Sequence, residues 1–176
     1  IYNANIVVTN DNIKNREDIA SIIELVINAK TELAHLVRTV AINKRITIND
    51  KFLNLIFYIG HANTLVHSNC VVAALEEDNL LESKYLLDII KLIAYSKSIY
   101  GAEAILSIIN SPYFNLENIM NVFELLSSAD DNSVAIKIYD EFKACNDKEN
   151  FSYANKTSNY NKTYNNESDR YVKFIE

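Results

Sequence analysis

The chain has 176 residues, of which 49% are hydrophobic and 23% are charged, and its net charge is −6. This length is sufficient for one folded domain with a sizeable core, while the acidity and the scattered Lys and Arg residues argue against nucleic acid or an anionic membrane as a partner. Only two Gly and one Pro are present, against typical shares of about 7% and 5%, which disfavours an all-β fold with tight turns and any glycine-rich phosphate loop.

Apolar residues recur at spacings of three and four through most of the chain, which predicts amphipathic helices. The first helix is expected from Asn15, a candidate N-cap, to about Asn43. Its apolar stripe consists of Ile19, Ile22, Val26, Ala29, Leu33, Leu36 and Val40. A second helix is expected from Asp50 through Val66, and it either breaks around Ser68 or continues to Leu75. Gly60 lies inside it, where a glycine costs about 1 kcal/mol against Ala but would let a neighbouring helix approach closely.

The segment 80–93 is apolar on nearly every side, which is typical of a helix at the centre of a bundle. We expect it to end at Gly101, because glycine tolerates the left-handed position that follows many helices. Asp88 and Lys91 interrupt its most apolar part, which is shorter than the roughly 20 residues of a membrane helix, so no membrane span is predicted. Three further helices are expected at 102–109, 115–126 and 132–145. The sequence thus predicts an all-α protein, a compact bundle of about six helices around an apolar central helix.

The composition changes after Asn146, where aliphatic residues become rare and Asn, Tyr, Ser and Thr abundant. Such a segment buries too little apolar area to offset the entropy lost on ordering. We therefore predict one helical domain at 1–146, with ordered helices from about residue 15, and a disordered polar tail at 147–176. The tail contains four N-glycosylation sequons, at Asn150, Asn155, Asn161 and Asn166. A tail of this composition also forms sequons by chance, so their use depends on secretion.

Cys70 and Cys145 are an even pair. In an oxidising compartment they would form a disulfide, and closing so long a loop would contribute about 4 kcal/mol; the alternative is two thiols in a helical core. The chain begins at Ile1 and not at Met, so we expect that sequence was removed before it, with a signal peptide as one candidate. Together these features favour an extracellular protein, with a cytoplasmic one as the alternative.

Residues suited to catalysis or metal binding are few. His67 and Cys70 lie one helical turn apart, but zinc requires three or four protein ligands, and a reactive thiol requires an open environment that stabilises the thiolate. The acidic groups at 76–78 and 130–131 lie at predicted helix junctions, where carboxylates usually face water. We therefore predict no enzyme, no metal and no cofactor.

The leading hypothesis is a non-catalytic helical protein that binds another protein, or itself, through a face or groove of the bundle. Eleven Tyr residues are consistent with this, because tyrosine is enriched at interfaces. A second hypothesis is a secreted carrier that holds an apolar small molecule in a cavity beside the central helix. A third is a structural or assembly protein whose tail self-associates.

Overall fold

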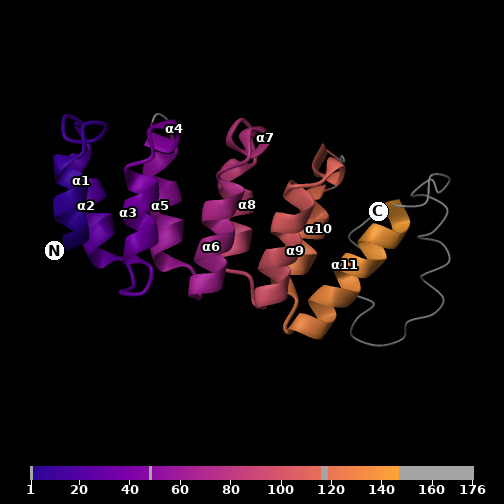
Figure 1. The fold of residues 1–176 in the computed structure, drawn as a ribbon. Helices are drawn as coiled ribbons and strands as arrows, with labels where there is room; N and C mark the ends of the chain where they lie inside the picture. Colours follow the sequence, from indigo (N-terminus) through magenta and orange to yellow (C-terminus); the bar gives the residue numbers. More distant parts are fainter. Residues whose placement is uncertain (1, 48, 116–118, 147–176) are drawn as a thin grey trace. The chain divides into compact units, whose positions relative to one another are not determined.

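The structure is a computed structural model that describes residues 2–47, 49–115 and 119–146 (Figure 1). Within these residues it contains eleven α-helices, one 3-10 helix and no strand, which confirms the all-α prediction. The helices in chain order are α1 (Tyr2–Thr9), α2 (Ile19–Asn28), α3 (Ala34–Ala41), α4 (Lys44–Thr47), α5 (Phe52–His61), α6 (Leu65–Ala74), α7 (Asp78–Leu81), α8 (Leu86–Ala94), α9 (Ile99–Ile109), the 3-10 helix η1 (Pro112–Asn115), α10 (Ile119–Ser128) and α11 (Asn132–Asn146).

The helices recur with a period of about 33 residues, which is the signature of a repeat protein. A first helix, a short turn and a second helix make up each repeat. The second helices α2, α5, α8 and α10 begin at Ile19, Phe52, Leu86 and Ile119. Their first helices are α1, α3, α6 and α9, and α11 occupies the place of a fifth first helix.

The turn after the first helix is built in the same way in all four repeats. A backbone N–H donates to the carbonyl oxygen three residues earlier in each turn. These bonds are Ile13 to Asn10 (3.0 Å), Ile46 to Asn43 (3.0 Å), Leu80 to Glu77 (3.1 Å) and Phe114 to Ser111 (3.3 Å). Short polar side chains favour such turns because they accept hydrogen bonds from the nearby backbone. Asn10, Asn43 and Ser111 each do so, from the N–H two residues later.

A second recurring hydrogen bond links the start of one repeat to the second helix that follows. The backbone N–H of Lys30 donates to the carbonyl of Gly60 (3.1 Å), that of Asn63 to Ala94 (2.9 Å), and that of Lys97 to Ser127 (2.8 Å). Because these bonds involve backbone atoms only, residues of different types serve as donor and acceptor in the three places.

The chain divides into two compact units, Ile1–Ser96 and Lys97–Glu176. In unit 1 the first helices α1, α3 and α6 form one row and the second helices α2, α5 and α8 form another (Figure 1). Each helix contacts the other helix of its repeat and its neighbours in its row. The core lies between the rows, where Ile22, Leu55 and Ile89 occupy the same position of three successive second helices and are at most 1% exposed.

In unit 2 the described residues are 97–115 and 119–146. The helices α9, α10 and α11 contact one another, and η1 packs against α9 and α10. Phe123 and Leu126 on α10 are fully buried, at positions that correspond to buried residues of α5 and α8. Unit 2 is therefore made of the same repeat as unit 1.

The predicted bundle of about six helices is not confirmed, because several predicted helices are divided. The stripe from 15 to 43 forms two helices, α2 and α3, and the backbone leaves the helical conformation at Ala29 (φ −59°, ψ 146°). The chain turns there because the N–H of Lys30 is bonded to Gly60, in the next second helix.

The apolar segment at 80–93 does not form a central helix. It contains the end of α7 and most of α8, and Asp88 and Lys91 are exposed on α8. Gly101 does not end this helix but lies in the first turn of α9, where its N–H donates to Ser98 Oγ at 3.0 Å. The predicted disordered tail at 147–176, with its four sequons, lies outside the described residues.

The close approach predicted at Gly60 is confirmed. A Cβ atom built on Gly60 would lie 3.0 Å from Ala29 Cβ and 3.1 Å from Val37 Cγ2. The first distance reaches the end of α2 and the second reaches α3, so the absence of a side chain allows three helices of unit 1 to meet at this point.

Candidate binding surfaces

The structure shows no disulfide between Cys70 and Cys145, so the predicted bridge is not supported. Cys70 is buried on α6, and Cys145 is partly exposed near the end of α11. Only Cys70 has the burial that the alternative of two thiols in a helical core requires. A buried thiol packs as a small apolar side chain, and Cys70 is 5% exposed on α6, which packs against α3, α5 and α8.

The candidate His67–Cys70 pair lies in the interior. His67 is 2% exposed, and its Nδ1 lies 2.8 Å from Thr64 Oγ1. Thr64 is the residue that precedes α6, so this contact joins a side chain of the first turn to the helix start. Within the described ranges no three His, Cys, Asp or Glu side chains are grouped to hold a metal ion.

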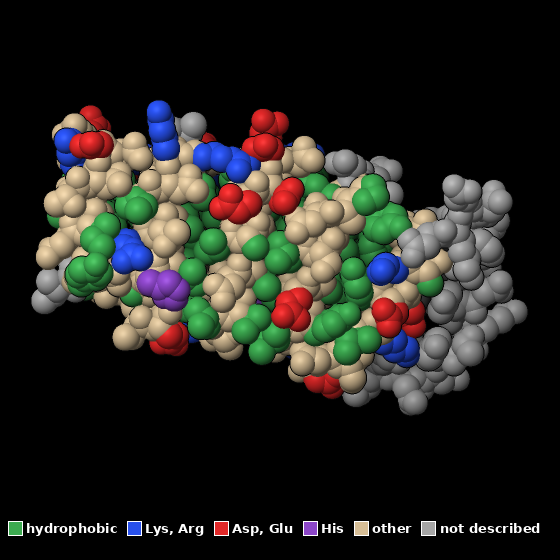
Figure 2. Space-filling view, viewed as in Figure 1, with side chains coloured by type: hydrophobic (Ala, Val, Ile, Leu, Met, Phe, Trp, Pro, Cys, Tyr) green, Lys and Arg blue, Asp and Glu red, His purple; other side chains and the backbone are tan. Residues whose placement is uncertain are grey.

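The two acidic groups flanking predicted helices are engaged with nearby polar groups. Asp78 forms an ion pair with Arg45, near the edge of unit 1 where α4 and α7 lie and charged side chains gather (Figure 2). Asp130 accepts a hydrogen bond from Lys97 Nζ at 2.6 Å. The Ser133 hydroxyl and the Val134 N–H donate to Asp131, and these bonds lower the pKa of Asp131 below its ordinary value. Asp131 thereby caps the start of α11.

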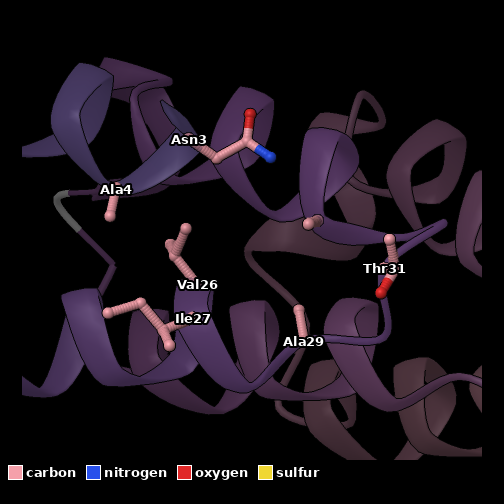
Figure 3. A pocket seen from close by; sticks show the side chains of 7 residues that line it. Asn3, Ala4, Val26, Ile27, Ala29 and Thr31 are labelled. Atoms are coloured by element: carbon pink, nitrogen blue, oxygen red, sulfur yellow. The ribbon is translucent and has the colours of Figure 1, made fainter. Parts of the chain in front are cut away.

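A surface pocket of about 220 Å³ opens between α1, α2 and the loop before α3 (Figure 3). Its lining is Asn3, Ala4, Val26, Ile27, Ala29, Thr31 and Ala34. Pockets that enclose small molecules usually measure about 300–1,000 Å³, so this one is small and open. It lies beside α1 to α3 and not beside α8, where the carrier hypothesis placed its cavity.

Four aromatic side chains meet on the second helices α5 and α8, and we call Phe57, Tyr58, His61 and Tyr95 the aromatic cluster. The Phe57 ring stacks on His61 (centroids 4.3 Å apart, planes at 18°) and meets Tyr58 edge-on at 5.7 Å. Tyr58 meets Tyr95 edge-on at 5.8 Å. Burial, with a smaller contribution from Tyr58, raises the pKa of Tyr95 above its ordinary value. The cluster therefore joins two neighbouring repeats through ring contacts.

Phe57 is more exposed than Tyr58 and Tyr95, with 39% of its surface open to solvent. Its position in the other repeats is occupied by Glu24, Lys91 and Glu124, all exposed. Charged residues at three of four equivalent sites show that the fold does not need an apolar side chain there. Phe57 is therefore an exposed aromatic residue that packing alone does not explain.

Comparisons of the chain with protein-family models, with curated proteins and with solved structures found no match. Of the helices that the structure describes, none has the length and apolar character needed to cross a membrane. The function must therefore be argued from the repeat and from the aromatic cluster.

The sequence contains a signal for the repeat that no single predicted helix shows. The second helices carry the same apolar pattern at a period of about 33 residues, as in Ile22, Leu55, Ile89 and Val122. With this period Tyr58 and Tyr95 fall near each other on adjacent helices. Without it, residues so far apart in the chain could not be assigned to one surface.

Proposed function

We propose that the chain is a non-catalytic repeat protein that binds another protein through the aromatic cluster on α5 and α8. The observation that supports this most is Phe57, an exposed ring at a position where the other repeats have Glu or Lys. Aromatic residues are enriched at protein interfaces and often contribute a large part of the binding energy.

The repeat supports the same proposal. A pair of helices repeated at about 33 residues is also the plan of ankyrin repeats, and helical arrays of this kind bind partners on surfaces formed by successive repeats. In unit 1 the aromatic cluster spans two such repeats. A partner that contacts Phe57 and Tyr95 would be recognised by both.

The test compares Phe57→Glu with Lys91→Glu, which introduces the same residue at the equivalent position of the next repeat. Both variants should keep their stability within about 0.5 kcal/mol, as exposed substitutions usually do. Loss of an interface hot spot costs at least about 2 kcal/mol, which corresponds to binding roughly 30-fold weaker. We expect this loss for Phe57→Glu alone.

The measurement is quantitative mass spectrometry of proteins retained from the native source by the immobilised wild-type chain and by each variant. Affinities of the retained proteins are then measured with purified components. A partner lost with Phe57→Glu and kept with Lys91→Glu supports the proposal. If the three chains retain the same proteins with equal affinity, the aromatic cluster is not the binding surface.

A further inference from the structure

His61 is held in place by a hydrogen bond to the backbone of its own helix. It is the last residue of α5, and its Nδ1 lies 2.9 Å from the carbonyl oxygen of Phe57, four residues earlier. A carbonyl oxygen can only accept a hydrogen bond, so Nδ1 carries the hydrogen and donates it. Residues four apart lie on the same side of a helix, and this bond therefore keeps the His61 ring beside the Phe57 side chain.

The His61 ring covers one side of the Phe57 ring. The two ring centroids are 4.3 Å apart and the ring planes differ by only 18°, which is a stacked arrangement. Tyr58 approaches Phe57 edge-on at 5.7 Å, so a second ring limits where the phenyl group can move. Phe57 nevertheless keeps 39% of its surface exposed. Contacts within α5 therefore hold this side chain, while part of the ring stays accessible.

Among the second helices that the structure describes, only α5 has an aromatic ring at both of these positions. The residues equivalent to Phe57 and His61 are Glu24 and Asn28 in α2, Lys91 and Tyr95 in α8, and Glu124 and Ser128 in α10. The repeat therefore folds without a stacked pair at this place. The stack occurs in the one repeat whose exposed residue is aromatic, which favours a role of His61 toward Phe57 over a role in helix packing.

An exposed side chain that moves among several rotamers loses this freedom when a partner binds it, and the loss weakens binding. A side chain that is already fixed avoids this loss. We propose that His61 is a positioning residue, which holds Phe57 in one χ1 rotamer in the free chain so that Phe57 meets a partner as a preformed anchor. The binding part of this inference rests on the proposed function, whereas the fixed rotamer is a property of the chain alone.

The test determines the χ1 rotamer of Phe57 by nuclear magnetic resonance, from three-bond coupling constants in the full chain with isotope-labelled phenylalanine. Phe57→Leu identifies the signals of Phe57 among those of the seven phenylalanines. We expect a single rotamer in the wild type. His61→Asn, which introduces the residue found at the equivalent position of α2, should let Phe57 exchange among rotamers. His61→Tyr, which introduces the residue found in α8, retains a ring that can stack and should keep the single rotamer.

Affinity is then measured for the partner that Phe57→Glu loses. His61→Asn should bind it about 2- to 12-fold more weakly than the wild type, the cost of ordering one side chain, and His61→Tyr should recover most of this loss. A Phe57 that exchanges among rotamers in the wild type, or that keeps one rotamer in His61→Asn, overturns the proposal, as does equal affinity of the two variants.

Failure of the proposed function gives a different result. Binding would then be unchanged in Phe57→Glu, while the coupling constants would still report whether His61 fixes the Phe57 rotamer. Circular dichroism checks that each variant is folded. If His61→Asn is not, His61→Ala takes its place, and the wild-type rotamer alone can still overturn the proposal.

Discussion

At the scale of single residues, Gly60 marks a close approach between helices of unit 1. A Cβ atom added to Gly60 would lie 3.0 Å from Ala29 Cβ and 3.1 Å from Val37 Cγ2. The carbonyl of Gly60 also accepts a hydrogen bond from the N–H of Lys30. Ala29 Cβ is attached directly to the backbone and cannot rotate away. Any side chain at Gly60 must therefore displace the end of α2.

Gly60→Ala tests this packing. Alanine gains about 1 kcal/mol of helix propensity over glycine, whereas overpacking a core costs about 1–3 kcal/mol. Because the opposing atom is rigid, we expect a net loss of about 1 kcal/mol in the free energy of unfolding, measured by urea denaturation. The double variant Ala29→Gly/Gly60→Ala removes the opposing methyl group and should recover part of this loss. If the Gly60→Ala single variant were more stable than the wild type, the end of α2 would be able to move away from the added methyl group at little cost in free energy.

At the scale of elements, local signals predicted that helices exist but not where they begin and end. Ala29 and Leu33 continue the apolar spacing of α2, so the sequence indicates one helix where the structure has two. The break depends on the bond from Lys30 to Gly60, thirty residues away, which no local pattern contains. Conversely, Gly101 resembles a helix end but lies near the start of α9, because Ser98 caps that helix.

Ser98→Ala is expected to weaken the start of α9. Ser98 is buried, and its Oγ accepts the N–H of Gly101 at 3.0 Å. Removing an N-cap hydroxyl costs about 1 kcal/mol, and urea denaturation followed by circular dichroism measures this loss. Ser98→Thr serves as the control, since Thr64 occupies the equivalent position before α6. Equal stability of the alanine and wild-type chains would mean that the cap contributes nothing to α9.

At the scale of the whole molecule, composition was sufficient to predict the fold class but not how the helices are arranged. The scarcity of Gly and Pro and the helical periodicity correctly gave an all-α protein. The repeat could not be predicted from a single apolar stripe, because the period of about 33 residues is visible only when successive stripes are aligned. The aromatic cluster was missed for the same reason, since its members come from α5 and α8 and meet only once the helices are arranged in a row.

Leu55→Ala tests whether stability is distributed as in a repeat protein. Leu55 is fully buried on α5, and truncating such a residue costs about 2–5 kcal/mol. Repeats interact mainly with their neighbours, so hydrogen exchange should accelerate most in α5 and in the helices that contact it, which are α2, α3, α6 and α8. Asn54→Ala, at an exposed position of the same helix, should leave exchange unchanged. An equal acceleration of α9, α10 and α11 would instead indicate one fully cooperative structure.

The bonds from Lys30, Asn63 and Lys97 to the second helices join main-chain atoms only. Duplicating or deleting the segment that encodes one repeat would therefore keep a backbone donor and a backbone acceptor for this hydrogen bond, whichever side chains the two residues carry. What such an event must preserve is a small residue where Gly60, Ala94 and Ser127 stand. The size of the residue at these three positions therefore limits which repeats can be placed side by side.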